Sequence, residues 1–179
     1  MNSPDLLCEA RISEPRWTQS FEDLEALCER VVAAASAHMK AQGEVAILFT
    51  NDAEMQALNR RWRGLDKPTD VLSFPADGPD IPGAPAYLGD IALAYETAMA
   101  DAVKMARPPE AHISHLLVHG FLHLLGYDHI ESADAAVMEP LESVILADLG
   151  WPDPYRTDAD RTDADRTDAD RTGPYGDPD

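Results

Sequence analysis

The chain has 179 residues, a formal net charge of −19 and a hydrophobic fraction of 45%. This length and composition are typical of one globular domain with a hydrophobic core, and no apolar run is long enough to cross a membrane. The acidic balance argues against a general nucleic-acid binder, because such proteins neutralise phosphates with a basic face.

The N-terminus reads M-N-S-P-D-L-L-C and has neither the basic start nor the long apolar stretch of a signal peptide. The chain contains two cysteines, Cys8 and Cys28, which in a protein without such a leader are expected to be reduced thiols. We therefore predict a cytoplasmic protein with no membrane segment.

The first fifty residues predict a strand, a helix and a second strand. Residues 6–13 form the first candidate strand. Apolar residues then recur at intervals of three and four over residues 21–42, which predicts a helix that is capped by Ser20 and ended by Gly43. The short apolar run over residues 44–50 has the length of a strand.

A second helix is expected from Asn51, its N-cap, to about Arg63. Glu54 stands three residues after Asn51, and this pair forms a capping box. One face of the helix is expected to be apolar through Met55, Leu58 and Trp62.

The remaining segments predict two more strands and three more helices. Strands are expected at residues 69–74 and 88–95, on either side of a Pro- and Gly-rich loop, and helices at residues 96–107, from about 110, and at 132–148. Pro140 is expected to kink or split the last helix. The alternation of strands and helices indicates the α/β (α+β) class, in two or three layers.

Three histidines follow the pattern H-x-x-x-H-x-x-G-x-x-H. His119 and His123 are four residues apart, which places them on one face of a helix. Gly126 can end this helix in a left-handed conformation and return the chain, so that His129 reaches the same ion. Three imidazoles around zinc leave a fourth position for water, as in catalytic sites. The sequence therefore predicts one Zn²⁺ ion and a hydrolytic reaction.

This spacing is also that of the metzincin proteases, but Gly120 stands where those proteases carry their general-base Glu. Peptide hydrolysis by that route is therefore not favoured. The alternative is that the three histidines are packing or surface residues at the C-terminal end of a helix and bind no metal. His115, one turn before His119, is expected to contact the substrate or to support a ligand, whereas His112 and His38 are expected at the surface.

A local basic cluster lies on this acidic chain. Of the ten Lys and Arg residues before residue 152, four lie within residues 60–67. Within the cluster, the planar guanidinium of Arg63 can bind a phosphate with two hydrogen bonds. An equally good alternative is that Arg63 meets the last carbonyls of its helix. Asp70 and Asp90 fall in predicted strands, where a carboxylate is expected to have a capping or polar role.

The C-terminus departs from a globular pattern. The sequence R-T-D-A-D occurs three times in succession over residues 156–170. Because these repeats have no large apolar side chains, they cannot offset the entropy of ordering. We predict a domain over residues 1–151 and a disordered acidic tail over residues 152–179, which contributes −5 of the net charge.

The motif H-G-x-L-H-L-x-G-Y-D-H that ends at His129, together with Arg63 and K-P-T-D-V-L-S-F over residues 67–74, resembles the YbeY family of bacterial endoribonucleases, also called rRNA maturation factors. The resemblance covers roughly residues 5–150. It implies a small mixed sheet, mostly parallel with one antiparallel strand, covered by helices.

The function that this resemblance implies is zinc-dependent cleavage of single-stranded RNA during rRNA processing and ribosome maturation. Its implied partners are rRNA, the small ribosomal subunit and assembly factors, and Arg63 and His115 become candidate catalytic residues. Two other functions fit the residues: a metzincin-like metallopeptidase, and a ribosome-assembly binding protein whose metal is mainly structural.

Overall fold

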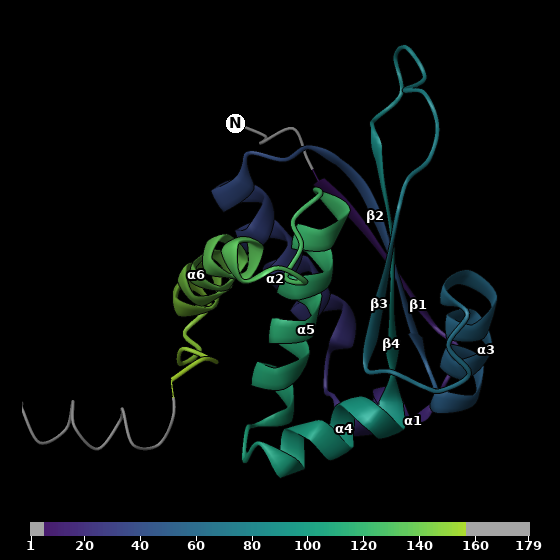
Figure 1. Cartoon of the computed structure of the whole chain (residues 1–179), viewed down its shortest axis with the longest axis vertical. Helices are drawn as coiled ribbons and strands as arrows, with labels where there is room; N and C mark the ends of the chain where they lie inside the picture. Colours follow the sequence, from purple (N-terminus) through teal and green to yellow (C-terminus); the bar gives the residue numbers. More distant parts are fainter. Residues whose placement is uncertain (1–5, 157–179) are drawn as a thin grey trace, which may run out of the picture.

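A computed structural model describes residues 6–156 of the chain, and Figure 1 shows strands and helices in the expected alternation. The strands are β1 (Leu6–Ile12), β2 (Gly43–Thr50), β3 (Val71–Pro75) and β4 (Tyr87–Ala94). The helices are α1 (Arg16–Ser20), α2 (Leu24–Met39), α3 (Asp52–Arg63), α4 (Tyr95–Lys104), α5 (Pro109–Leu124) and α6 (Ser132–Asp148).

The four strands form one mixed sheet in the order β1-β2-β4-β3. β1 and β4 both pair with β2 in parallel, whereas β3 pairs with β4 antiparallel and forms an edge of the sheet. The expected fold class, a small and mostly parallel mixed sheet covered by helices, is therefore confirmed. The Pro- and Gly-rich segment 76–86 joins β3 to β4 as a loop that extends beyond the sheet (Figure 1).

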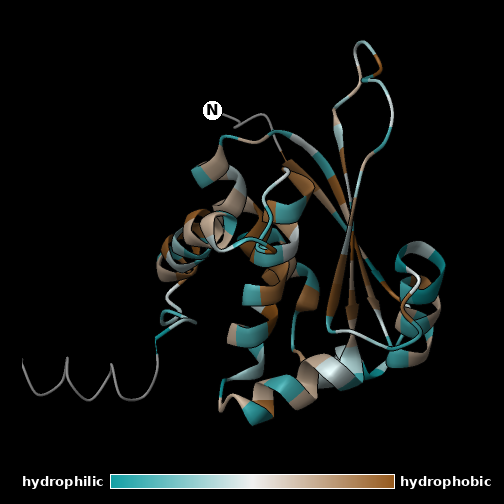
Figure 2. Ribbon diagram, viewed as in Figure 1, coloured by the Kyte–Doolittle hydropathy of each residue, from teal (hydrophilic) through white to brown (hydrophobic). Residues whose placement is uncertain are grey.

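Helices cover both faces of the sheet, and each face has its own apolar core. The larger core lies where α2, α5 and α6 stack on one face, and it includes Trp17, Phe49 and Leu117. The smaller core lies under α3 on the other face and contains Met55 and Leu72. Figure 2 shows the hydrophobic residues concentrated on these inward faces. Among residues 6–156, no helix combines the length and the apolar character needed to cross a bilayer.

The helix predicted over residues 21–42 is shorter than expected. It begins at Leu24 because the side chain of Asp23, rather than Ser20, caps it by accepting a hydrogen bond from the Ala26 N–H (2.9 Å). It ends at Lys40, which adopts the left-handed conformation, and Gly43 is already the first residue of β2. The preceding residues form the separate short helix α1, which the apolar spacing did not predict.

The helix predicted from Asn51 is confirmed, but the apolar face expected on it is buried only in part. The Asn51 side chain accepts the Glu54 N–H (2.9 Å), as predicted for the N-cap. The Glu54 carboxylate accepts a hydrogen bond from the Thr50 hydroxyl instead of completing the predicted capping box. Trp62, by contrast, is 62% exposed near the end of α3, where its ring makes a T-shaped contact with Phe74, with 6.2 Å between the ring centroids.

The last helix is continuous, so Pro140 does not split it. Pro140 lies on the exposed side of α6, where the carbonyl that loses its hydrogen bond can reach water.

The first residues of the expected tail contact the domain. Asp153 accepts a hydrogen bond from Ser143 (2.9 Å), Arg107 donates to the Pro154 carbonyl, and the Tyr155 hydroxyl donates to Glu142. The rest of the predicted tail, including nearly all of the R-T-D-A-D repeats, lies outside the described residues, so its disorder stays a prediction.

Candidate metal centre

The three histidines of the motif meet at one end of a cleft. His119 and His123 project from α5, and His129 follows the turn at Gly126, whose φ of 94° is in the left-handed region that favours glycine. One ring nitrogen of each histidine lies within 4.8 Å of the others. This is the arrangement that the sequence spacing predicts, and it can hold one metal ion.

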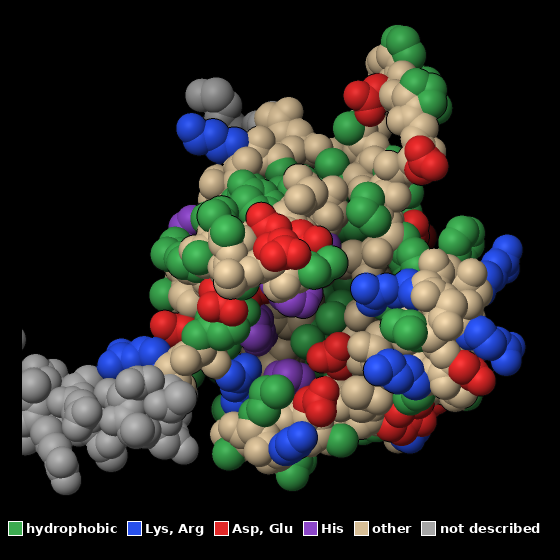
Figure 3. Space-filling model, in the orientation of Figure 1, with side chains coloured by type: hydrophobic (Ala, Val, Ile, Leu, Met, Phe, Trp, Pro, Cys, Tyr) green, Lys and Arg blue, Asp and Glu red, His purple; other side chains and the backbone are tan. Residues whose placement is uncertain are grey.

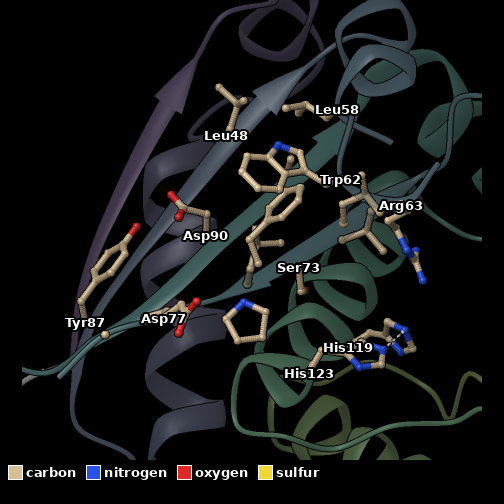
Figure 4. A pocket seen from close by; sticks show the side chains of 18 of the residues that line it. Leu48, Leu58, Trp62, Arg63, Ser73, Asp77, Tyr87, Asp90, His119 and His123 are labelled. Atoms are coloured by element: carbon tan, nitrogen blue, oxygen red, sulfur yellow. Dashed lines mark hydrogen bonds between the residues drawn. The ribbon is translucent and has the colours of Figure 1, made fainter. Parts of the chain in front are cut away.

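The hydrogen bonds of His119 and His123 direct the same atom of each ring into this cluster. His123 Nδ1–H donates to the Tyr127 carbonyl (2.8 Å), and His119 Nδ1–H donates to Glu142 Oε1 (2.5 Å). Both acceptors lack a proton, so in the neutral rings Nε2 carries the lone pair. The two Nε2 atoms are 3.0 Å apart (Figure 4). Two lone pairs at this distance repel each other unless a cation lies between them, and a divalent metal ion meets this need.

Glu142 is the main support of this site, and the motif analysis did not predict it. It is fully buried in α6, and its carboxylate accepts hydrogen bonds from His119, from His115 Nε2 (3.2 Å) and from the Tyr155 hydroxyl. Burial alone would raise the pKa of Glu142, but these hydrogen bonds outweigh it and lower the pKa to about 2. A carboxylate thus fixes the His119 ring, as is common for histidines that bind metals.

The pKa of His123 is lowered, first by burial and then by the neighbouring His119. The lowered pKa favours the neutral ring, which is the form that coordinates metal.

We expect the substitution Glu142→Gln to weaken metal binding about 10- to 100-fold, because the amide loses the charge that orients His119. Competition against a chromophoric chelator measures this affinity. Glu139→Gln, on the same helix, is the matched control, since among residues 6–156 the Glu139 side chain forms no hydrogen bond or ion pair with the three histidines. Equal affinities for the Glu142 variant, the control and the wild type would contradict this role.

His115 lies on the outer side of Glu142 rather than in the cleft. Its Nε2 contacts Glu142 and its Nδ1 is 3.3 Å from an Arg107 nitrogen. The described residues that line the cleft include His119, His123 and His129 but not His115. Of the two roles that the sequence left open for His115, this position favours support of a ligand over contact with substrate.

The cleft has a volume of about 1280 Å³ and follows the edge strand β3. Its walls include α3, the loop 76–86 and the histidine cluster. Figure 4 shows Arg63 above His119 and His123 at one end, with Tyr87 and Asp90 at the other. In Figure 3 the histidine side chains line a hollow that faces Lys and Arg side chains of the α3 region.

Arg63 is placed to reach into this cleft. It is the last residue of α3, and Gly64, with a φ of 70°, turns the chain after it. Within residues 6–156, no hydrogen bond or ion pair is formed by the exposed guanidinium of Arg63, whereas Arg60 pairs with Asp66 and Arg61 lies over the Trp62 ring. The position therefore favours the phosphate-binding interpretation over the helix-end interpretation.

Gly120 has a packing role that explains why no carboxylate stands there. A Cβ at this position would lie 2.9 Å from Ile91 Cγ2 and 3.0 Å from Ser73 Oγ, and Ser73 donates a hydrogen bond to the Gly120 carbonyl (2.9 Å). The position faces the sheet rather than the cluster, so the helix lies close to β3 and β4 and carries no general base of the metzincin kind.

The substitution Gly120→Val is expected to lower stability by about 1–3 kcal/mol through overpacking, or roughly 2–12 °C in Tm. Thermal unfolding measures the loss. Ala136→Val, on the exposed side of α6, introduces the same β-branched side chain into a helix without this contact. If both variants melt at the same temperature, the close approach at Gly120 does not limit the packing.

A mixed α/β fold with a three-histidine cluster at the end of a cleft is typical of a metal-dependent hydrolase. The family model described as "Endoribonuclease YbeY" matches residues 11–150. Relatives named endoribonuclease YbeY include one from Bradyrhizobium diazoefficiens, 49% identical over 87% of this chain and 88% of its own length, and one from Rhodopseudomonas palustris, 51% identical over 76% and 85%. The chain belongs to the endoribonuclease YbeY family.

A solved structure supports the fold independently. The solution structure of TM1509 from Thermotoga maritima is similar with a TM-score of 0.55, over 96% of this chain and 100% of that chain. Because the two sequences are only 21% identical, this likeness concerns the fold alone.

Proposed function

We propose that this protein is a zinc-dependent endoribonuclease that cleaves single-stranded RNA in rRNA processing and ribosome maturation. The observation that carries the proposal is the pair of facing Nε2 atoms of His119 and His123 at the end of an open cleft. Family membership supports RNA as the substrate. An rRNA substrate would place the protein in the cytoplasm, with the small ribosomal subunit and assembly factors as partners.

His119, His123 and His129 hold the ion in this proposal, and Glu142 keeps His119 in its binding orientation. A zinc ion held there would supply Lewis acidity, which is able to polarise a phosphate and to lower the pKa of water. Arg63 binds a phosphate oxygen and stabilises the charge that develops on it during cleavage. His115 acts through Glu142 as a positioning residue.

The cleft also suits unpaired bases. Aromatic rings line it: Trp62 is 62% and Tyr87 is 45% exposed, and Phe74 of β3 is in ring contact with Trp62. Exposed rings beside cationic side chains bind single-stranded nucleic acid by stacking under its bases. The bases of a duplex are already stacked and paired, so these surfaces favour a single strand. The acidic body confines RNA contacts to this local site.

The substrate class is tested by incubating the metal-loaded protein with a single-stranded RNA, the same RNA in a duplex, and a set of peptides. We expect cleavage of the single strand, much slower cleavage of the duplex, and intact peptides. Peptide cleavage with intact RNA would overturn the proposal in favour of a metallopeptidase. If neither is cleaved while the metal stays bound, the alternative of a binding protein with a structural metal is favoured.

A further inference from the structure

A fourth histidine of α5 is buried at the opposite end of this helix from His123. His112 is only 2% exposed, so the prediction that it lies at the surface is wrong. Helix α5 packs against α4 and β3, and His112 lies beside Asp101 of α4. Within the described residues, neither ring nitrogen of His112 has a hydrogen-bond partner. Because a buried polar group without a partner costs roughly 1–3 kcal/mol, this ring calls for an explanation.

Two carboxylates face this ring from two other elements. Asp70 immediately precedes β3, and Asp101 lies in α4. A carboxylate oxygen of each and a ring nitrogen of His112 all lie within 4.8 Å of one another. Within residues 6–156, the hydrogen bonds to the Asp70 carboxylate come from its sequence neighbours, the Val71 N–H (2.7 Å) and the Thr69 hydroxyl (3.3 Å). Asp70 thus has a capping role, and its carboxylate still has acceptor capacity for a further group.

The negative charge of the Asp70 and Asp101 carboxylates is only partly balanced by the groups around them. Burial raises the pKa of Asp101, and Asp70 and Asp52 raise it further, while Lys104 opposes them. Burial lowers the pKa of His112 to about 4, with His115 and Arg107 acting in the same direction and Asp70 against it. At neutral pH the ring is therefore uncharged, so it can offer a lone pair but cannot neutralise the two carboxylates.

We propose that Asp70, Asp101 and His112 form a second divalent-cation site, separate from the three-histidine cluster. Two carboxylate oxygens and one imidazole nitrogen are a donor set that suits Zn²⁺ or Mn²⁺. A cation there satisfies the buried ring and neutralises the paired carboxylates. It also joins the start of β3, α4 and the N-terminal half of α5. Since Asp70 lines the cleft, the second ion lies at its wall and fixes the helix that carries His119 and His123.

This site does not rest on the proposed RNA cleavage, so it is tested by counting ions. Metal-free protein is equilibrated with Zn²⁺ or, separately, with Mn²⁺, and bound ions are measured by elemental analysis. We expect two ions in the wild type and one in His119→Ala/His123→Ala. Adding Asp101→Asn to this double variant is expected to remove the remaining ion. The Zn²⁺ and Mn²⁺ arms show which metal the site prefers.

Asp80→Asn in the exposed loop 76–86 is the matched control, since it removes the same charge away from the cluster. All variants keep the same acidic tail, so any ions that it binds weakly add equally to every count. The second site is therefore judged from the change in bound ions that Asp101→Asn causes. Thermal unfolding verifies that each variant is folded, and if Asp101→Asn does not fold, Asp70→Asn takes its place. A count that Asp101→Asn leaves unchanged, or a double variant that holds no ion, would overturn the second site.

Discussion

The substitution His119→Ala is expected to abolish RNA cleavage and to remove the ion from the three-histidine cluster. Zinc binding to four protein ligands is worth about 10–16 kcal/mol, so one lost ligand costs roughly 2.5–4 kcal/mol, or about 10²- to 10³-fold in affinity. The loss is larger in activity than in stability, because His119 is partly exposed and lies outside the apolar core. Metal titration and a cleavage assay on the same sample measure both effects.

His38→Ala is the control for this experiment. His38 lies in α2, pairs with Asp148 and is distant in sequence and position from the cleft. It should retain the metal and the cleavage rate of the wild type. If His119→Ala also keeps both, the ligand assignment is wrong and the facing nitrogens of His119 and His123 share a proton rather than a metal.

Arg63→Ala and Arg63→Lys are expected to cleave RNA about 10²- to 10³-fold more slowly, by analogy with the loss of one donor to a developing oxyanion. Lysine keeps the charge but loses the two-pronged geometry that fits a phosphate, so it should rescue little of the rate. Stability should change by no more than about 0.5 kcal/mol, because Arg63 is exposed at a helix end.

Arg61→Ala provides the matched control for Arg63. Arg61 belongs to the same basic cluster, but its guanidinium lies over the Trp62 ring, 5.1 Å from the centroid. A general loss of positive charge would slow Arg61→Ala and Arg63→Ala alike, whereas a specific phosphate contact affects Arg63 far more. Wild-type rates in both Arg63 variants, with folding and metal content unchanged, would leave Arg63 as only a helix-end residue.

The helices and strands were predictable where local signals agreed. The N-cap at Asn51, the glycine turn at Gly126 and the spacing of the three histidines all act within a few residues, and the structure places each as expected. The end of α2 was mispredicted because Lys40 adopts a left-handed conformation that the sequence pattern assigns to glycine. The exposure of Trp62 could not be predicted from its place on the apolar face of α3, because it depends on contacts between this helix and the sheet.

The supporting residues of the site depend on contacts between distant segments. Glu142 is 23 residues from His119, and no motif joins them. One signal was present: Glu142 occupies a position four residues after Met138 and three before Ile145, both buried, so a charged residue stands in the apolar stripe of α6. His112 carries a similar signal, since the buried residue Leu116 stands four positions after it on the same face of α5. In both cases, a charged or titratable residue on the apolar face of a helix indicated a buried polar group.

The most direct test of the account is to restore RNA cleavage to metal-free protein by adding zinc. Chelator-treated wild type should leave single-stranded RNA intact, and the cleavage rate should return as the three-histidine cluster fills. The same titration of His119→Ala/His123→Ala should restore nothing, even if the second site binds its ion. Cleavage by the metal-free wild type at the untreated rate, or full recovery in the double variant, would contradict a metal at His119, His123 and His129 as the centre of the reaction.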